Sequence, residues 1–253
     1  MTQQSIASEL IAALRVASHV VALTGSGISA ESGVPTFRDA QTGLWSKYEP
    51  EELATPAAFK RNPKLVWDWY TWRRELIAAA APNDAHRALV TLAEQVPHFT
   101  LITQNVDGLH QAAGSPSVIE LHGNIQRTKC LTEEIIIEQW DEHPDRPPHC
   151  PNCGSCLRPD VVWFGEPLPT AALSQALDAV GRCDLFLSVG TSALVQPAAS
   201  LALEAQSTGA QVAEINLQST PLSPYADFVL RGQAGKILPT LVRTIIEGPS
   251  ARS

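Results

Sequence analysis

Short apolar runs of strand length recur along the chain. They lie at 20–25, 99–103, 117–121, 184–190, 211–216 and 227–231. Several of these runs are almost continuously apolar, which is typical of parallel strands that are covered on both faces. The pattern therefore predicts the strands of a mostly parallel sheet.

Segments of helical character separate most of these strands. We expect helices over 5–17, 63–80, 85–95, 171–180, 197–208 and 236–246. Asn83 or Asp84 is available to cap the helix that begins near residue 85. Strands that alternate with helices form a parallel sheet with helices on both faces. The predicted fold class is therefore α/β, with a Rossmann-like sheet.

Two stretches interrupt this alternation. Residues 40–84 contain a long helix and no strand, whereas residues 123–157 contain four of the five cysteines and a loop rich in Pro, His and Asp. We predict that these two insertions leave the sheet domain, which is formed by 1–39, 85–122 and 158–253, and build a smaller lobe. The second insertion would resemble a zinc ribbon. A ligand would bind in the cleft between the lobes.

The composition is that of an ordinary globular protein. Of the 253 residues 44% are hydrophobic and 17% are charged, and the formal net charge is -8. This acidic balance disfavours direct binding to nucleic acid, which needs a basic footprint. No apolar run approaches the roughly 20 residues of a membrane-spanning helix, and the N-terminal segment lacks the features of a signal peptide. We expect a cytoplasmic protein without a membrane partner, and the oligomeric state stays open.

The first predicted strand ends in a glycine-rich turn. Residues 25–30, GSGISA, have the form G-x-G-x-x-A between a strand and an expected helix start. The glycines allow a tight turn and a close approach of the backbone to a pyrophosphate, and the helix N-terminus offers N–H groups. Dehydrogenases carry an acidic residue about 20 residues further on, at the end of a second strand, and this chain has no strand there. The turn therefore indicates a dinucleotide site that differs from that of hydride-transfer enzymes.

Two further predicted strands end in polar groups. Gln104, Asn105 and Asp107 offer amide and carboxylate groups that suit ribose hydroxyls and a carboxamide. His122 ends the third predicted strand and can take up a proton near neutral pH. Because a doubly wound sheet gathers its ligand groups at the carboxyl ends of its strands, we expect these side chains in one site. For His19, His86, His98 and His143 we expect only structural roles.

Six segments together resemble the sirtuins, the NAD-dependent protein deacylases. They are GSGISAESGVPTFRD (25–39), TQNVDGLH (103–110), ELHG (120–123), VVWFGE (161–166), GTS (190–192) and INL (215–217). One such motif can arise by chance, but these stand in the family's order and most follow a strand. The resemblance extends from about residue 20 to residue 238. It implies a Rossmann-like enzyme that uses NAD to remove acyl groups from lysine side chains of proteins or peptides.

The resemblance also implies roles for individual residues. The acyl oxygen would attack C1′ of the nicotinamide ribose, with Asn105 and the general base His122 as catalytic residues. The products would be nicotinamide, free lysine and an O-acyl-ADP-ribose. The residues expected to hold NAD are Gly25, Ser26, Gly27, Ser29, Ala30, Ser32, Pro35, Phe37, Arg38, Gln104, Asn105, Asp107, Gly190, Thr191, Ser192, Asn216, Leu217, Gln218 and Ala234. The substrate backbone would pair, as an added strand, with Val161, Val162, Trp163 and Phe164.

A tyrosine and an arginine on the long helix bear on the choice of acyl group. Tyr70 and Arg73 are three residues apart, so they share one helix face. A hydroxyl and a guanidinium side by side make a carboxylate site. This pair, with VVWFGE, resembles the desuccinylase branch of the sirtuins and implies removal of succinyl, malonyl or glutaryl groups, with weaker deacetylation. The alternative is a surface salt bridge for Arg73 and core packing for Tyr70.

The cysteine segment resembles the structural zinc site of sirtuins, but one of the two cysteine pairs is incomplete. Glu133 stands where the partner of Cys130 is expected. The candidate zinc ligands are Cys130, Cys150, Cys153 and, in fourth place, Cys156, Glu133 or His149. We expect Cys156 because zinc favours sulfur, with Glu133 as the alternative. An empty site held by packing is also compatible with the sequence.

Three other functions fit part of the pattern. An NAD hydrolase or ADP-ribosyltransferase on the same fold would share the glycine turn, Asn105 and Asp107, but VVWFGE and the Tyr70/Arg73 pair favour an acyl-lysine substrate. A sensor of NAD without turnover would not need His122. A zinc-ribbon nucleic-acid binder is disfavoured by the net charge of -8.

Overall fold

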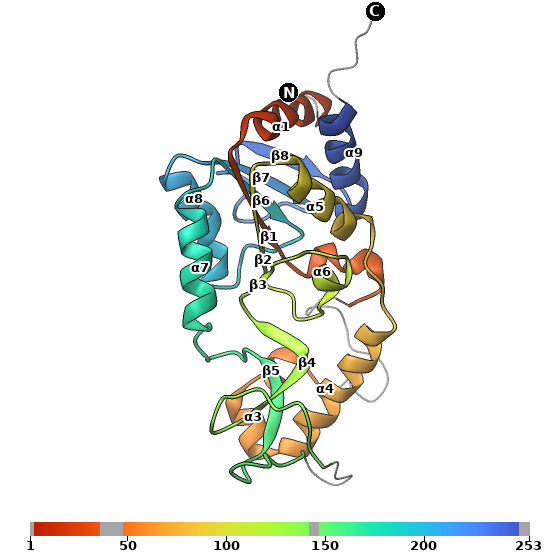
Figure 1. The fold of residues 1–253 in the computed structure, drawn as a ribbon, viewed down its shortest axis with the longest axis vertical. Helices are drawn as coiled ribbons and strands as arrows, with labels where there is room; N and C mark the ends of the chain where they lie inside the picture. Colours follow the sequence, from red (N-terminus) through yellow and green to blue (C-terminus); the bar gives the residue numbers. More distant parts are fainter. Residues whose placement is uncertain (1–2, 36–47, 142–146, 248–253) are drawn as a thin grey trace, which may run out of the picture.

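A computed structural model of the chain describes residues 3–35, 48–141 and 147–247. Its main element is a six-stranded sheet in the order β3-β2-β1-β6-β7-β8 (Figure 1), in which every pairing is parallel. The strands are β1 (His19–Thr24), β2 (His98–Thr103), β3 (Ile119–Glu120), β6 (Leu185–Val189), β7 (Gln211–Asn216) and β8 (Phe228–Arg231). The predicted parallel sheet is confirmed, with a third strand that is shorter than expected.

Helices cover both faces of this sheet. The helices are α1 (Gln3–Val16), α5 (Asp84–Gln95) and α9 (Ala234–Glu247) on one face, and α7 (Thr170–Val180) and α8 (Leu201–Ser207) on the other. Successive residues of β1 enter opposite cores, because side chains alternate along a strand. Val20 packs with α1, α5 and α9, whereas Val21 packs with α7 and α8. The predicted α/β fold is therefore confirmed.

Three helices and a pair of strands form a smaller lobe, at the bottom of Figure 1. They are α2 (Pro50–Leu53), α3 (Pro56–Arg61), α4 (Pro63–Ala78) and the antiparallel pair β4 (Gly123–Cys130) and β5 (Leu157–Val161). The sequence pattern predicts α4 but neither β4 nor β5. Because β5 pairs with β4, the second insertion extends to Val161, past the expected boundary at residue 157.

The core of the smaller lobe is aromatic and continues into the loops of the sheet domain. Trp69, Tyr70 and Trp163 belong to one buried cluster. The same cluster contains Val34, which follows β1, and Leu109, which follows β2 and lies in the short helix α6 (Leu109–Ala112). The lobe therefore packs on the loops that the sequence assigns to NAD.

The carboxyl ends of β1 and β6 lie side by side at the centre of the sheet, where such folds bind their ligands. Gly27 N donates a hydrogen bond to Gly190 O at 2.8 Å. A Cβ atom on Gly27 would lie 2.7 Å from Gly190 O, and one on Gly190 would lie 2.5 Å from Ile28 N. Gly190 also has a positive φ of 60°. The contact between the two turns thus requires glycine on both sides.

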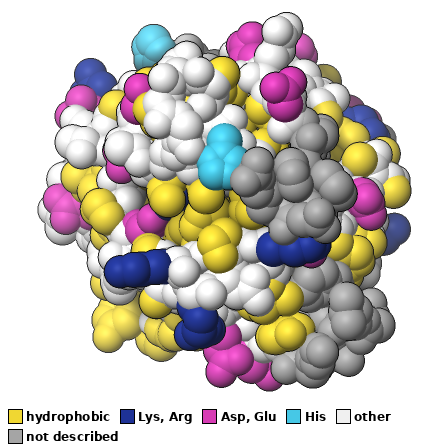
Figure 2. All heavy atoms as spheres, turned by 90° about the horizontal axis from the view of Figure 1, so that it is seen from below, with side chains coloured by type: hydrophobic (Ala, Val, Ile, Leu, Met, Phe, Trp, Pro, Cys, Tyr) yellow, Lys and Arg dark blue, Asp and Glu magenta, His cyan; other side chains and the backbone are white. Residues whose placement is uncertain are grey.

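Within the described residues, no helix is both long and apolar enough to cross a membrane. Seen from the end of the smaller lobe, the surface carries acidic and basic side chains among hydrophobic ones (Figure 2). This face therefore mixes charges of both signs with apolar groups.

Candidate active site

A pocket of about 200 Å³ lies at the carboxyl ends of β6 and β7, against the glycine turn. Its lining includes six residues that the sequence analysis assigns to NAD, namely Gly27, Ala30, Gly190, Asn216, Leu217 and Ala234. Ser26, Ser192 and Gln218, assigned to NAD as well, are not among the lining residues. Four more residues line the pocket: Glu31 and Ile215 lie within the motifs at 25–39 and 215–217, whereas Gly232 and Gln233 were not foreseen. Gly232 directly follows β8. Because ligand groups gather at the ends of parallel strands, this position could have been predicted from the sequence.

Glu31 ties the glycine turn to the last helix. Its Oε1 accepts a hydrogen bond from Gly235 N at 2.8 Å, in the first turn of α9. A carboxylate is favourable at this end of a helix because the first N–H groups lack partners and carry a partial positive charge. The contact joins positions 204 residues apart, which explains why local patterns did not reveal it.

Thr191 links three strand ends around the pocket. Its hydroxyl accepts a hydrogen bond from Gln104 Nε2 at 2.8 Å, and its carbonyl accepts one from Asn216 Nδ2 at 2.7 Å. Gln104 follows β2, Thr191 follows β6 and Asn216 ends β7. The structure therefore brings these three predicted site residues together. The side-chain amides of Gln104 and Asn216 are held in fixed orientations.

A buried polar cluster continues the site toward β2. Ser29 Oγ donates to Asp107 Oδ2 at 2.7 Å, and Asn105 Nδ2 donates to Ser29 Oγ at 3.2 Å and to Gly25 O at 3.1 Å. Burial raises the pKa of Asp107, although hydrogen bonds from Leu109 N and Ser29 oppose this rise. The cluster fastens the loop after β2 to the glycine turn and gathers four residues that the sequence assigns to the site.

Two histidines lie beneath this cluster. The rings of His86 and His110 are 4.8 Å apart, with His86 Nε2 3.4 Å from Ser29 Oγ and His110 Nε2 2.9 Å from Thr24 Oγ1. Burial lowers the pKa of His86 to about 4 and that of His110 to about 3, so both are neutral at pH 7. Among the described atoms, His110 Nδ1 is buried without a hydrogen-bond partner. His86, for which only a structural role was expected, thus supports the polar cluster of the site through Ser29. The sequence analysis assigns no role to His110, which contacts Thr24.

The orientation of the His122 ring is set through one of its two nitrogens. Its Nδ1 lies 2.8 Å from Gln104 O. Because a carbonyl oxygen only accepts, Nδ1 carries the proton and Nε2 keeps its lone pair. Burial lowers the pKa of His122, and the bond to Gln104 opposes this effect. The imidazole is therefore neutral at pH 7 and able to take up a proton at Nε2.

Gly123, beside this histidine, is required by the strand pairing of the smaller lobe. Its φ is 78°, and a Cβ atom there would overlap Asp160 O in β5. No other residue therefore fits at this point of the pairing between β4 and β5.

The segment expected to pair with the substrate backbone runs beside His122. Val162 N donates to His122 O at 2.9 Å, Trp163 N to Glu166 Oε2 at 2.8 Å and Phe164 N to Ala54 O at 2.9 Å. The N–H groups of all three residues are therefore bonded within the chain. A peptide that adds here has to use carbonyl acceptors or displace one of these bonds.

Tyr70 and Arg73 are both buried on α4. Trp163 Nε1 donates to the Tyr70 hydroxyl at 3.0 Å, and the Arg73 guanidinium lies 5.2 Å from the centre of the Trp69 ring. Burial raises the pKa of Tyr70 to about 12 and lowers that of Arg73. Tyr70 does pack in the core, and Arg73 is itself only 9% exposed.

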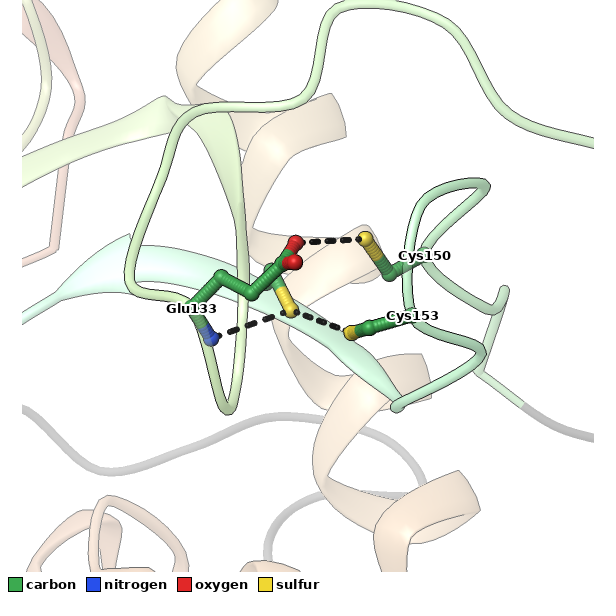
Figure 3. A group of neighbouring side chains, drawn as sticks. Glu133, Cys150 and Cys153 are labelled. Atoms are coloured by element: carbon green, nitrogen blue, oxygen red, sulfur yellow. Dashed lines mark hydrogen bonds between the residues drawn. The ribbon is translucent and has the colours of Figure 1, made fainter.

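Three cysteines and Glu133 form a cluster whose ligand atoms all lie within 4.8 Å of one another (Figure 3). Cys130 Sγ is 3.4 Å from Cys153 Sγ, and Cys150 Sγ is 3.4 Å from Glu133 Oε2. Three thiolates and one carboxylate suit a tetrahedral zinc ion, for which neighbouring sulfurs lie about 3.7 Å apart. The residues present therefore fit a structural zinc site.

This geometry corrects the choice of Cys156 as the fourth ligand. Leu157 packs with Cys130 and Cys150, whereas Cys156 packs with the aromatic core of the lobe. The two residues are neighbours in an extended segment, so their side chains point to opposite sides. Glu133, the alternative, takes the place expected for Cys156.

Phe37 and Arg38, which the sequence assigns to NAD, lie outside the described residues. Pro35 is the last residue described before them, and its side chain is exposed. Ser32, also assigned to NAD, accepts a hydrogen bond from Asn83 Nδ2 at 2.9 Å. The same asparagine caps α5, so Asn83 rather than Asp84 fills that role.

The chain is similar to known proteins over most of its length. The model of the Sir2 family matches residues 25–197. An NAD-dependent protein deacylase of Aquifex aeolicus is 54% identical over 219 residues, which cover 85% of this chain and 90% of that protein. A crystal structure of a Sir2 homologue in complex with NAD has a TM-score of 0.89 at 47% identity, covering 95% of this chain and 94% of that chain. A mutant Sir2 homologue in complex with 2′-O-acetyl ADP-ribose has a TM-score of 0.88 at 47% identity, with 96% and 98% covered.

The buried histidines predict that stability falls in mild acid. In the unfolded chain both imidazoles take up protons near pH 6.5, whereas in the folded chain they stay neutral down to about pH 4 for His86 and about pH 3 for His110. The free energy of unfolding in urea should therefore fall by on the order of 3 kcal/mol between pH 7 and pH 5. His110→Gln should reduce this fall by about half, and an unchanged pH dependence in that variant would contradict the assignment.

The cysteine cluster predicts about one zinc ion per chain, bound with Glu133 and without Cys156. Metal analysis should find zinc in the purified protein and in Cys156→Ser, and a clear loss of zinc in Cys150→Ser and Glu133→Gln. Cys150→Ser should also unfold at a lower temperature because structural zinc contributes to folding. Zinc lost from Cys156→Ser but kept in Glu133→Gln would restore Cys156 as the ligand.

Proposed function

Because the chain belongs to the Sir2 family, we propose that it is an NAD-dependent deacylase of acyl-lysine side chains in proteins or peptides. The acyl group passes to ADP-ribose, and nicotinamide and free lysine are released. The observation that carries the proposal is the neutral His122, whose Nδ1 is bound to Gln104 O and whose Nε2 makes no hydrogen bond among the described residues, at the same edge of the sheet as the glycine turn. A base with that geometry has no use in a module that only senses NAD.

The residues around the strand ends fit NAD. The backbone contact of Gly27 with Gly190 leaves a cradle without side chains, and the adjoining pocket leads to Asn216 and Ala234. When bound, NAD supplies the ribose carbon that takes the acyl oxygen as nicotinamide leaves. Similarity to a Sir2 homologue that was solved with NAD supports this placement.

The buried polar residues hold the reacting groups in place. Asn105 and Asp107 present an amide and a carboxylate beside the glycine turn, and their bonds to Ser29 limit their movement. His122 then accepts the proton of a ribose hydroxyl at Nε2 while Nδ1 stays bound to Gln104 O. Fixing one nitrogen in this way sets the orientation of the other.

We further propose a preference for acidic acyl groups, namely succinyl, malonyl or glutaryl. Arg73 is a buried cation beside the hydroxyl of Tyr70, and this donor set suits a carboxylate. The segment next to His122 reaches Tyr70, because Trp163 bonds to Tyr70 and its neighbour Val162 bonds to His122. An acyl chain that passes from the base toward α4 would therefore end near Tyr70 and Arg73.

The deacylase activity is tested by mass spectrometry of one lysine peptide, acetylated or succinylated, incubated with the protein and NAD. We expect NAD-dependent loss of the acyl group with formation of the matching O-acyl-ADP-ribose. His122→Ala should reduce this rate at least about 100-fold, because general-base catalysis contributes factors of that size. Nicotinamide release without any loss of acyl group would instead indicate an NAD hydrolase.

The acidic-acyl preference predicts a larger loss of activity for a succinyl peptide than for an acetyl peptide when Arg73 is replaced. Arg73→Met should lower kcat/KM for the succinyl peptide about ten-fold or more relative to the acetyl peptide, because a charged hydrogen bond is lost. Tyr70→Phe should act in the same direction with a smaller effect. Arg61→Met, an exposed arginine of the same lobe, serves as the control. An unchanged ratio in Arg73→Met would return the pair to a structural role.

A further inference from the structure

Trp163 stands between the base and the proposed acyl-reading pair. Its neighbour Val162 donates to His122 O at 2.9 Å, and its own indole N–H donates to the Tyr70 hydroxyl at 3.0 Å. The side chain is 1% exposed and belongs to the aromatic core of the smaller lobe. A short series of contacts therefore connects the base with Tyr70 on α4.

The direction of the indole bond fixes the role of the tyrosine oxygen. Tryptophan offers only a donor, so the Tyr70 oxygen must be the acceptor in this pair. The phenolic proton is then available for a different acceptor. With its pKa raised to about 12, Tyr70 keeps that proton throughout the neutral range.

The indole itself is held on two sides. The Arg158 guanidinium lies 3.3 Å from the centre of the Trp163 ring, and it forms two bonds with Glu166, of 2.5 and 2.8 Å. Glu166 also accepts the backbone N–H of Trp163 at 2.8 Å. Arg158 is 5% exposed, so this clamp lies inside the lobe. The clamp limits rotation of the ring, and with it the position of the indole N–H.

We propose that Trp163 is a positioning residue for acyl selection, whose indole N–H occupies the acceptor side of the Tyr70 hydroxyl and turns the phenolic proton toward an acyl carboxylate. The inference rests on the proposed preference for acidic acyl groups. It assigns to the Trp163 side chain a role that is separate from backbone pairing with the substrate. Without the indole N–H, the hydroxyl is free to rotate and donates to the carboxylate in only part of its orientations.

The test removes the N–H and compares two substrates. Trp163→Phe keeps an aromatic ring next to Arg158, and we expect the ratio of kcat/KM for succinyl over acetyl peptide to fall about three- to ten-fold, as for loss of one neutral hydrogen bond. The fall should appear mainly in KM for the succinyl peptide. In a Tyr70→Phe background the same substitution should leave the ratio unchanged, because the hydroxyl that it positions is already absent.

Two controls separate this role from loosened packing. Phe186→Leu truncates a fully buried aromatic side chain of the sheet domain, in a core cluster that contains no residue of α4, and should leave the ratio unchanged. The sulfur analogue benzothienylalanine, incorporated at position 163 alone, keeps the bicyclic ring and removes only the N–H. It should reproduce the fall in the ratio even if Trp163→Phe does not fold.

The outcomes separate the role of Trp163 from the proposed preference for acidic acyl groups. If Arg73→Met and Tyr70→Phe leave the ratio unchanged, the preference for acidic acyl groups fails and the role of Trp163 falls with it. If those variants change the ratio but the analogue at position 163 does not, only the role of Trp163 is overturned. The same holds if Trp163→Phe lowers the ratio equally with and without the Tyr70 hydroxyl.

Discussion

The contact between the turns after β1 and β6 is the constraint on which the site depends. Gly27 and Gly190 approach so closely that a side chain on either would overlap the backbone of the other turn. This approach brings the glycine turn against the strand end that carries Thr191, and Thr191 in turn holds Gln104 and Asn216. The glycines are therefore fixed by the fold itself, and the cradle for a dinucleotide is a consequence of the same backbone crossing.

The buried histidines of the site are uncharged. His86 and His110 form a neutral layer below Ser29, and His122 is kept neutral by its own burial. Burying neutral imidazoles costs less free energy than burying charged ones. Asp107 remains the acidic group of the cluster. Of these imidazoles, that of His122 is oriented by a backbone carbonyl, Gln104 O.

Short sequence motifs predict those features of the fold and the site that depend on residues close together in the chain. The strands of the parallel sheet, the glycine turn and the residues after β2 and β3 all follow from short motifs. Contacts across the chain were missed, such as Glu31 on the first turn of α9 or the edge-to-face contact of His86 with His110. The choice between Cys156 and Glu133 failed for the same reason. Sulfur preference favoured the cysteine, but the direction of its side chain is set by how β5 pairs with β4.

Helix α4 explains how a zinc module can matter to a reaction it does not touch. Trp67 on this helix packs with the cysteine segment, in a cluster that contains Cys130 and Cys150. Tyr70, almost one turn later, packs on the other core, which includes Val34 of the loop after β1. The helix is thus held between the metal module and the cofactor loops. Loss of a bound metal would loosen one of these two supports, so the packing of α4 depends on the cysteine module as well as on the loops of the sheet domain.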